Sequence, residues 1–311
     1  MQVAVFPGQG SQAPGMGQDL VAASPAAAAV FDEVGEALGL DIRKLCWDTD
    51  AETLRQTQNA QVALFATGVA AFRALQEAHG GWTPQAMAGH SVGEYAALVS
   101  GGWLSVATGA KLVRRRGEIM AASGKDRPGT MAAVLGMERA ALEALCEELS
   151  QGGQIVVIAN DNSPGQLVVS GDVNAVQALS ASAGERGAKR VLPLNVSGAF
   201  HSPLMKEGAA ALAEALSGAE FQAGTVPVVS NVTAQPETDW PARLAEQMVQ
   251  PVRWTETVQG WAAQGLNMQV ECGHGEVLGG LLRRIAPEVA GARVVDSATL
   301  QETVKKLGGA P

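Results

Sequence analysis

The pentapeptide Gly89-His90-Ser91-Val92-Gly93 carries the clearest chemical signal in the chain. A serine between two glycines at this spacing is typical of a nucleophile elbow, a sharp strand-to-helix turn that exposes the serine Oγ. Glycines are needed there because a Cβ would collide where the strand and the helix cross. The helix that follows would offer free N–H groups and a positive dipole end to an oxyanion. The alternative is a glycine-rich turn that happens to contain serine, but the flanking pattern favours acyl chemistry at Ser91.

A serine nucleophile needs a base, and the chain holds four histidines. A lipase- or esterase-like hydrolase would take its base from the loop after the last strand, where His274 follows a predicted strand at 268–272, with Asp239 as the candidate acid. An acyltransferase would instead use His201. A non-catalytic binding or scaffolding protein is a third reading, which the intact elbow at Ser91 argues against. The two remaining histidines are assigned to a helix end and to local packing: His79 and His90.

The composition describes an acidic chain that can bury a sizeable core. Of 311 residues, 47% are hydrophobic and 17% are charged, with a net charge of −9 and a pI near 5.0. This charge balance argues against nucleic acid as a general partner. Three widely separated cysteines form neither a disulfide framework nor a metal-binding spacing, which indicates a reducing compartment. Because residues 2–6 enter a strand directly and no apolar run could span a bilayer, we expect a soluble cytoplasmic protein without a signal peptide.

The loop after the first strand imitates a dinucleotide-binding fingerprint. Gly8 and Gly10 have the right spacing, but Pro14 interrupts the helix that should begin there. The next acidic pair, Asp32 and Glu33, falls in an Ala-rich helical stretch and not at the end of a strand. We therefore expect no nucleotide or flavin cofactor, and no metal site.

The order of predicted elements indicates an α/β protein in two parts. Residues 130–195 follow the order β-α-β-β-α-β, which is the ferredoxin-like unit. A linker at 123–130 leads into it, so we predict a ferredoxin-like insert at 126–197. The flanking segments, 1–125 and 198–311, would form an α/β-hydrolase-like catalytic domain with a parallel sheet. Its predicted helices and remaining strands lie at 24–38, 57–79, 94–99, 108–121, 203–217, 226–230, 241–248, 254–263 and 276–285.

Several motifs together resemble the malonyl-CoA:acyl carrier protein transacylase family, and the resemblance covers nearly the whole chain. Each motif is weak alone, but the set in this order is specific. The motifs are Phe6-Pro7-Gly8-Gln9-Gly10-Ser11-Gln12, Gly89-His90-Ser91-Val92-Gly93-Glu94-Tyr95, Arg116-Gly117, Asn160-Asp161-Asn162-Ser163-Pro164-Gly165-Gln166, Gly198-Ala199-Phe200-His201-Ser202 and Pro251-Val252-Arg253-Trp254.

The resemblance implies transfer of malonyl from CoA to the pantetheine thiol of an acyl carrier protein. Ser91 would carry the malonyl group, and His201 would be its base. A backbone carbonyl orients this histidine in the family, and the matching position is Gln247. The oxyanion hole would use the backbone N–H groups of Gln9 and Val92. A polyketide-pathway acyltransferase with the same mechanism remains an alternative.

Two further side chains would select the acyl group. Malonyl ends in a carboxylate, which a bidentate guanidinium recognises and a lysine cannot imitate. Spacing alone does not separate Arg114, Arg115 and Arg116; the resemblance selects Arg116, and Gly117 after it favours close packing. Phe200 beside the histidine would disfavour a branched methylmalonyl group, or serve as a core residue, or both.

The remaining expectations concern substrates and partners. Asn160 and Asn162 would contact pantetheine or shape the mouth of the site, or else form a turn. The expected partners are malonyl-CoA and an acidic acyl carrier protein, and the expected state is a monomer. Docking of the carrier would need a local basic patch. The candidate pairs are Lys189-Arg190, Arg283-Arg284 and Lys305-Lys306.

Overall fold

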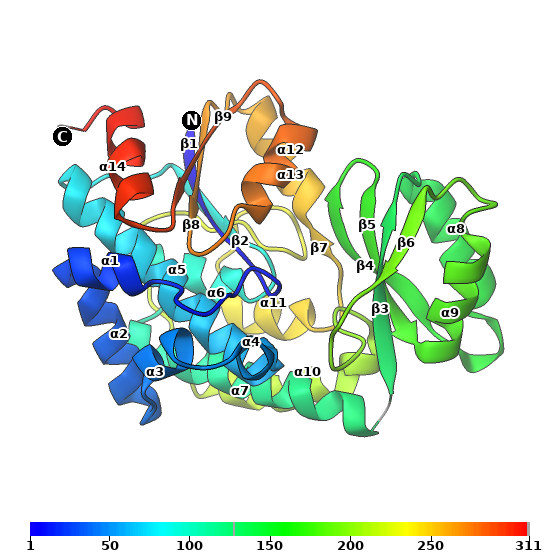
Figure 1. The fold of residues 1–311 in the computed structure, drawn as a ribbon. Helices are drawn as coiled ribbons and strands as arrows, with labels where there is room; N and C mark the ends of the chain where they lie inside the picture. The colour runs from blue at the N-terminus through cyan, green and yellow to red at the C-terminus, as the bar shows by residue number, and fades with distance from the viewer. Residues whose placement is uncertain (127, 310–311) are drawn as a thin grey trace.

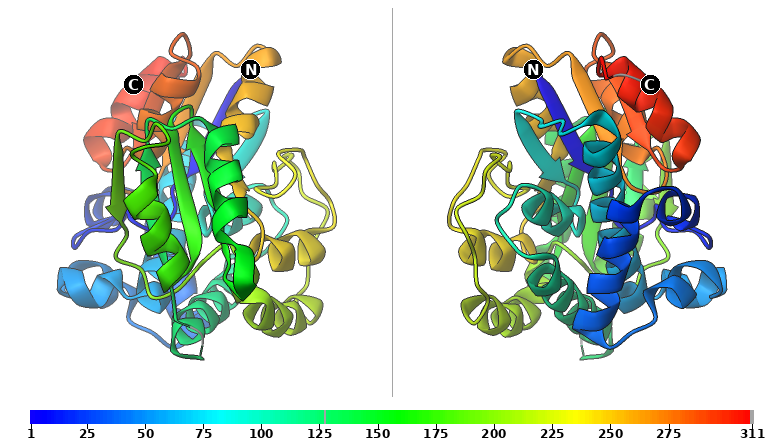
Figure 2. Two further views of the ribbon diagram at one scale, coloured as in Figure 1. Left: turned by 90° about the vertical axis from the view of Figure 1, so that its right-hand side faces the viewer. Right: turned by 90° about the vertical axis from the view of Figure 1, so that its left-hand side faces the viewer.

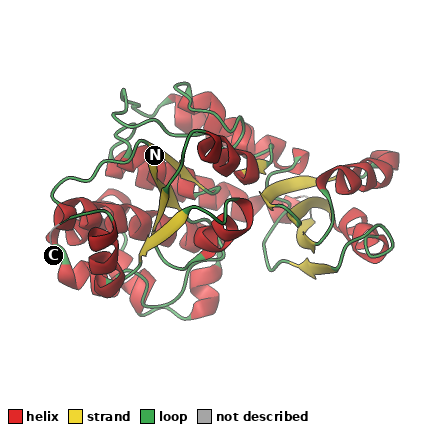
Figure 3. Ribbon diagram, turned by 90° about the horizontal axis from the view of Figure 1, so that it is seen from above, coloured by secondary structure: helices red, strands yellow, loops and turns green. Residues whose placement is uncertain are grey.

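The computed structural model describes residues 1–126 and 128–309, which form two α/β units side by side (Figure 1). The larger unit is built on a four-stranded sheet in the order β2-β1-β8-β9, and every pair in it is parallel. Helices surround this sheet (Figure 3), so its inner strands are almost wholly buried, as parallel strands usually are. The four strands are β1 (Gln2–Phe6), β2 (Ala86–Gly89), β8 (Met268–Cys272) and β9 (Ala290–Val294).

Helix α5 is the central helix of the larger unit. Most of its side chains are buried, because α2, α6 and α7 pack against it from different directions. Its predicted bounds, 57–79, agree with the structure, and so does the predicted capping of α2, where the Ser24 side chain accepts from the N–H of Ala27 at 3.1 Å. The helices of this unit are α1 (Gln18–Ala23), α2 (Pro25–Leu38), α3 (Ile42–Trp47), α4 (Ala51–Arg55), α5 (Thr57–His79), α6 (Gly93–Ser100), α7 (Val106–Asp126), α10 (Lys206–Ser217), α11 (Trp240–Gln247), α12 (Trp254–Ala263), α13 (Val277–Ile285) and α14 (Ser297–Lys306).

The smaller unit has the ferredoxin-like order of strands. Its sheet runs β6-β3-β5-β4 with antiparallel pairs, and α8 and α9 cover the outer face (Figure 2, left). A separate hydrophobic cluster lies beneath these helices. The bounds 126–197 stay our prediction for the insert. Its elements are β3 (Gly129–Leu135), α8 (Arg139–Leu149), β4 (Val156–Ser163), β5 (Gln166–Asp172), α9 (Val173–Ser182) and β6 (Arg190–Pro193).

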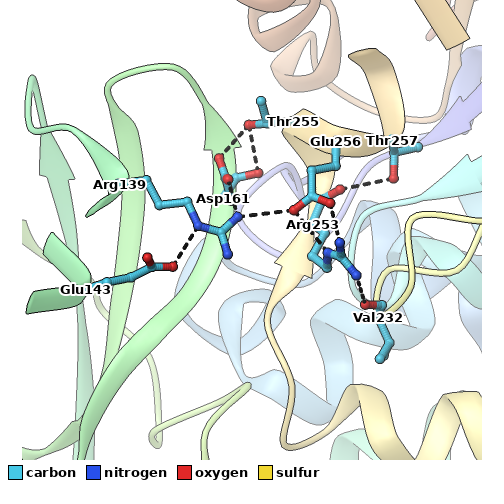
Figure 4. A network of polar contacts seen from close by, with 8 residues as sticks. All are labelled: Arg139, Glu143, Asp161, Val232, Arg253, Thr255, Glu256 and Thr257. Atoms are coloured by element: carbon cyan, nitrogen blue, oxygen red, sulfur yellow. Dashed lines mark hydrogen bonds and ion pairs between the residues drawn. The ribbon is translucent and has the colours of Figure 1, made fainter. Parts of the chain in front are cut away.

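A strand from the larger unit completes the small sheet. Strand β7 (Val252–Arg253) pairs in parallel with β4, so this sheet has a fifth strand that the sequence pattern did not predict. Polar contacts reinforce the junction (Figure 4). Arg139 of α8 bridges Asp161 of β4, at 2.9 Å, and Glu256 of α12, at 3.2 Å. The two units are therefore joined by backbone pairing and by ion pairs.

Three predicted segments are wrong. Residues 226–230 form only isolated bridges, because Pro227 has no N–H with which to extend a ladder beside β2. The predicted linker at 123–130 is mostly regular structure: α7 continues to Asp126 and β3 begins at Gly129, while residue 127 lies outside the described residues. The predicted turn around Asn160 and Asn162 is confined to Pro164 and Gly165, because both asparagines belong to β4.

Candidate active site

The segment between β2 and α6 forms the sharp turn that the sequence predicts. Ser91 sits in it with a left-handed φ of 52°, a conformation that costs energy for a residue other than glycine. A Cβ on Gly89 would lie 1.8 Å from the carbonyl carbon of Gly93, and one on Gly93 would lie 2.2 Å from the oxygen of Phe6. Both glycines are therefore required by the close crossing of the strand and the helix, and the turn lifts the serine hydroxyl out of the sheet.

The serine hydroxyl contacts His201, a residue that follows the small unit in the sequence. Its Nε2 lies 2.8 Å from Oγ of Ser91, and its Nδ1 lies 2.8 Å from the carbonyl oxygen of Gln247 at the end of α11. Since a carbonyl only accepts, Nδ1 carries the proton and Nε2 is left as the acceptor. The sequence-predicted pairing of His201 with the Gln247 carbonyl is therefore present in the geometry.

Burial and a nearby cation keep this imidazole neutral. Removal from water, followed by the positive charge of Arg116, lowers the pKa of His201 to about 3. A neutral imidazole is the form that can take a proton from the serine.

The alternative base and acid do not reach the serine. His274 lies half-buried in the loop after β8, and no hydrogen bond joins it to Ser91 in the described part of the chain. Asp239 caps α11 by accepting from the N–H of Ala242 at 3.4 Å. The geometry therefore favours His201 and gives the esterase-like arrangement no support.

Arg116 is the one arginine of its run that enters the core. Its side chain is fully buried, whereas Arg115 is exposed and Arg114 is paired with Glu118. Its Nη2 donates to Oγ of Ser91 at 3.0 Å. Because a guanidinium can only donate, the serine proton must point to His201.

The surroundings of Arg116 explain how a charged side chain can be buried there. Its Nη1 donates to Gln61 of α5 at 2.8 Å, and its Nη2 also donates to Oε1 of Gln247 at 2.8 Å. Helix α7 can approach α5 this closely because residue 117 is glycine: a Cβ there would lie 2.8 Å from the Cα of Gln58. The guanidinium also faces the ring of Tyr95, 5.8 Å from its centroid.

Two backbone N–H groups near the nucleophile are free to bind an oxyanion. Within the described residues, the amides of Gln9 and Val92 have no hydrogen-bond acceptor. Gln9 lies in the loop after β1, and Val92 is the N-cap of α6. Their position and free state are consistent with the role that the resemblance implies for them.

A cavity of about 360 Å³ opens over Ser91 between the two units. Phe200 and Asn160 line it, as predicted. Asn162 does not appear in its lining; its Oδ1 lies 2.8 Å from Nε2 of His90, whose ring packs against Trp254 at 5.7 Å between centroids. Asn162 thus links the small unit to the elbow in the structure. The other lining residues are Gln9, Gly10, Gln12, Arg55, His90, Met120, Met131, Leu194, Asn195, Val196 and His201.

Sequence reasoning missed several polar residues of the site. Glu94 is fully buried behind the serine, and Asn231 accepts from the N–H of Ser91 at 2.8 Å. Gln61 holds Arg116 from α5, and Arg55 reaches the cavity from the end of α4. The motif around Ser91 includes Glu94 and could have drawn attention to it. The other three stand in segments without a recognisable pattern.

Neither a metal site nor a membrane-spanning helix is present in the described residues. No group of three or more His, Cys, Asp or Glu side chains in residues 1–126 and 128–309 could hold a metal ion. No helix within these ranges is long and apolar enough to cross a bilayer.

Comparison with known proteins places the chain in one family. A family model described as "Acyl transferase domain" matches residues 3–300. The malonyl CoA-acyl carrier protein transacylase of Bacillus subtilis is 42% identical over 306 residues, which is 97% of this chain and 96% of the relative. The crystal structure of an acyl carrier protein S-malonyltransferase from Vibrio cholerae is 41% identical, with a TM-score of 0.93 over 97% of this chain and 99% of that one. A solved structure described as a type II PKS acyl-carrier protein in complex with its malonyl-transacylase contains a similar chain, at 40% identity and a TM-score of 0.93 over 98% of this chain and 99% of that one. From the geometry of its site and from these matches, the chain belongs to the acyl transferase domain family.

Proposed function

We propose that the protein transfers a malonyl group from malonyl-CoA to the pantetheine thiol of an acyl carrier protein, through a malonyl-Ser91 intermediate. The observation that carries this proposal is the buried guanidinium of Arg116, whose Nη2 lies 3.0 Å from the nucleophilic oxygen. Only one methylene separates the malonyl carboxylate from the thioester carbonyl. A cation so close to the nucleophile therefore suits an acyl group with a carboxylate, and it offers nothing to a neutral one. Malonyl-charged carrier would supply fatty acid synthesis.

The first half-reaction acylates the serine. His201 takes the hydroxyl proton at Nε2 while Oγ of Ser91 forms a bond to the thioester carbonyl. The carbonyl oxygen becomes an oxyanion, which the N–H groups of Gln9 and Val92 bind. The C–S bond then breaks, and His201 returns the proton to the departing CoA thiolate. Removing one donor of such an oxyanion hole typically costs about 3 kcal/mol.

The second half-reaction repeats these steps with the carrier. Its pantetheine thiol gives a proton to His201, and the sulfur attacks the malonyl ester on Ser91. The same oxyanion hole serves, the C–O bond breaks, and Ser91 recovers its proton from the imidazolium. These steps use only groups of the chain, so we propose that the reaction has no resident metal or organic cofactor.

Recognition of the acyl group depends on Arg116. In the free protein its Nη2 donates to Ser91 and to Gln247. The malonyl carboxylate would replace the serine as acceptor, forming two charge-assisted hydrogen bonds in a partly dry cavity. Phe200, which is 4% exposed and lines the cavity over Ser91, would crowd a substituent on the α-carbon.

Asn160 and the exposed pair Lys189-Arg190 are proposed to serve the carrier. Asn160 lines the cavity on the side of the small unit, where it would contact pantetheine, and Asn162 would hold the mouth of the site in shape through His90. Both basic residues of the pair are exposed at the start of β6, beside Leu192, which is 41% exposed. This combination suits an acidic partner with an apolar contact. The cytoplasmic location and the monomeric state remain predictions.

The adduct on the serine tests the proposal directly. After brief mixing with malonyl-CoA, intact mass spectrometry should show one malonyl group on the protein, and peptide mapping should place it on Ser91. Adding holo-carrier should discharge it to the carrier thiol faster than buffer hydrolyses it. Acylation of Ser91→Ala at the wild-type rate would exclude the mechanism.

A further inference from the structure

A buried carboxylate lies directly behind the nucleophile. Glu94 belongs to the first turn of α6 and is fully buried. Its Oε1 accepts from the backbone N–H of Asn231 at 2.6 Å, and its Oε2 accepts from Nε2 of Gln247 at 2.6 Å. No step of the proposed reaction uses this group, although a buried carboxylate is costly unless it is compensated.

The directions of the hydrogen bonds show which form of Glu94 is present. Arg116 can only donate, so Gln247 must turn its Oε1 to Arg116 and its Nε2 to Glu94. The other oxygen of Glu94 faces a backbone N–H, which also can only donate. Burial raises the pKa of Glu94, whereas these two hydrogen bonds and the charge of Arg116 oppose that rise. Both partners donate, and within the described residues no acceptor faces Glu94 for a proton of its own, so the hydrogen bonds favour the ionised carboxylate.

Glu94 and Arg116 therefore form a separated charge pair. Both side chains are fully buried, with the amide of Gln247 between them. The charge of each side chain favours the charged form of the other. A direct ion pair would occupy the guanidinium with a protein carboxylate. The intervening amide accepts one hydrogen bond from Nη2 and leaves the second hydrogen of Nη2 to reach Ser91.

The same carboxylate also reaches the other reacting groups through its two partners. Asn231, held by its N–H, accepts from the N–H of Ser91 at 2.8 Å and donates from Nδ2 to the carbonyl of Gly89 at 2.7 Å. Gln247 supplies the carbonyl that orients His201.

We propose that Glu94 is a positioning residue that keeps Arg116 charged, unpaired with any protein carboxylate and aimed at Ser91 until the carboxylate of the acyl group binds. This inference rests on the proposed function, in which Arg116 receives that carboxylate. Glu94 touches neither the acyl group nor the reacting atoms, and it acts through Gln247.

The substitution Glu94→Gln tests the polarity of this arrangement at almost constant size. The new amide has an NH₂ group in place of one carboxylate oxygen. Either the backbone N–H of Asn231 or the NH₂ of Gln247 would then face this NH₂ group, and two donors cannot form a hydrogen bond. If Gln247 turns to relieve the conflict, its own NH₂ meets Nη2 of Arg116 and displaces the guanidinium. We expect acylation of Ser91 by malonyl-CoA to fall by about 10- to 100-fold, and acylation by acetyl-CoA, which needs no carboxylate site, to change by less than about threefold.

A matched control is available in Glu271→Gln. Glu271 is also buried, at 1% exposure, and it also accepts two hydrogen bonds, from the N–H groups of Leu278 and Gly279 at the start of α13. It lies outside the cavity over Ser91. This variant should lose thermal stability but keep the wild-type ratio of malonyl to acetyl acylation.

The ratio of the two acylation rates, measured by intact mass in single turnovers, decides the outcome. Equal losses for malonyl and acetyl in Glu94→Gln, or an equal shift of the ratio in Glu271→Gln, would overturn the proposal. If the wild-type protein gained no malonyl group on Ser91, the proposed function itself would fail, which is a separate result.

A second variant applies if Glu94→Gln does not fold. Gln247→Glu keeps the backbone carbonyl that orients His201 but places a carboxylate directly on Arg116. The two neighbouring carboxyl groups would share a proton, because like charges in contact cannot both ionise. We expect malonyl acylation to be lost while acetyl acylation persists. An unchanged malonyl-to-acetyl ratio in Gln247→Glu would refute the inference.

Discussion

Nη2 of Arg116 donates a hydrogen bond to Oγ of Ser91 at 3.0 Å, although Arg116 belongs to α7 and Ser91 to the turn before α6. The serine oxygen therefore lies between a group that can only donate and the imidazole of His201, at 2.8 Å. This arrangement sets the direction of the hydroxyl proton before any substrate binds. Under the proposed function, a carboxylate that binds Arg116 would replace the serine oxygen as the acceptor of this hydrogen bond.

Replacing Arg116 should separate malonyl from acetyl transfer. Arg116→Ala should lower malonyl acylation of Ser91 by about 10- to 100-fold, because a charge-assisted hydrogen-bonded pair is lost, while acetyl acylation is kept or rises. Arg116→Lys should not restore malonyl acylation, since an ammonium lacks the bidentate fork. Arg115→Ala, an exposed neighbour, is the control. Equal losses with both acyl groups would remove Arg116 from the carboxylate role.

The two candidate bases can be compared in matched variants. His201→Ala should lower the acylation rate by about 10²- to 10⁴-fold, the usual contribution of a positioned base. His274→Ala should leave the rate within about threefold of wild type, because no hydrogen bond joins its side chain to Ser91 among residues 1–126 and 128–309. Stopped-flow release of CoA measures both. A large loss in His274→Ala with a small loss in His201→Ala would restore the esterase-like arrangement.

The acylation rate should not show the fall at mildly acidic pH that protonation of an ordinary histidine base causes. Burial and the charge of Arg116 lower the pKa of His201 to about 3, so the imidazole stays neutral and basic as the pH falls through 6.5. The acylation rate with malonyl-pantetheine, which carries no phosphate that titrates, should therefore show no histidine limb near pH 6.5. A limb near 6.5 in the wild type would contradict this expectation.

The charge of Arg116 should also affect the pH dependence of the acylation rate. Arg116→Ala removes a cation that disfavours the imidazolium, so the pKa of His201 should rise and the acid limb should move to higher pH. Acetyl-pantetheine is the suitable substrate for this variant, because it does not need the arginine. A limb that stays where the wild-type limb lies would show that the charge does not act on the base.

Phe200 should govern tolerance of a branched acyl group. Phe200→Ser opens space in the cavity and should raise the rate with methylmalonyl-CoA relative to malonyl-CoA by about 10- to 100-fold, corresponding to about 1–3 kcal/mol for one methyl group. The melting temperature, followed in parallel, reports the loss of a buried ring. Loss of stability with an unchanged ratio of the two rates would leave Phe200 as a core residue only.

The sequence alone determined the elbow, but it left His201 and His274 open as the base until the family resemblance favoured His201. Gly89 and Gly93 are demanded by a local backbone crossing, and such steric requirements act between residues close in the chain. The order of strands and helices at 130–195 likewise predicted the ferredoxin-like unit, because hydrophobic periodicity is a local property. The family resemblance, carried by motifs read in order, then added the pairing of His201 with the Gln247 carbonyl.

Only the tertiary structure decided which polar side chains are neighbours of the serine. Nothing in the run Arg114 to Arg116 separates the three arginines by spacing; the close contact of α7 with α5 at Gly117 buries one of them. Asn231 and Glu94 meet because segments 137 residues apart share a buried hydrogen bond. The pairing of β7 with β4 has the same origin. Such contacts depend on how whole elements pack. The local sequence pattern around a residue does not indicate which distant donor or acceptor it will contact.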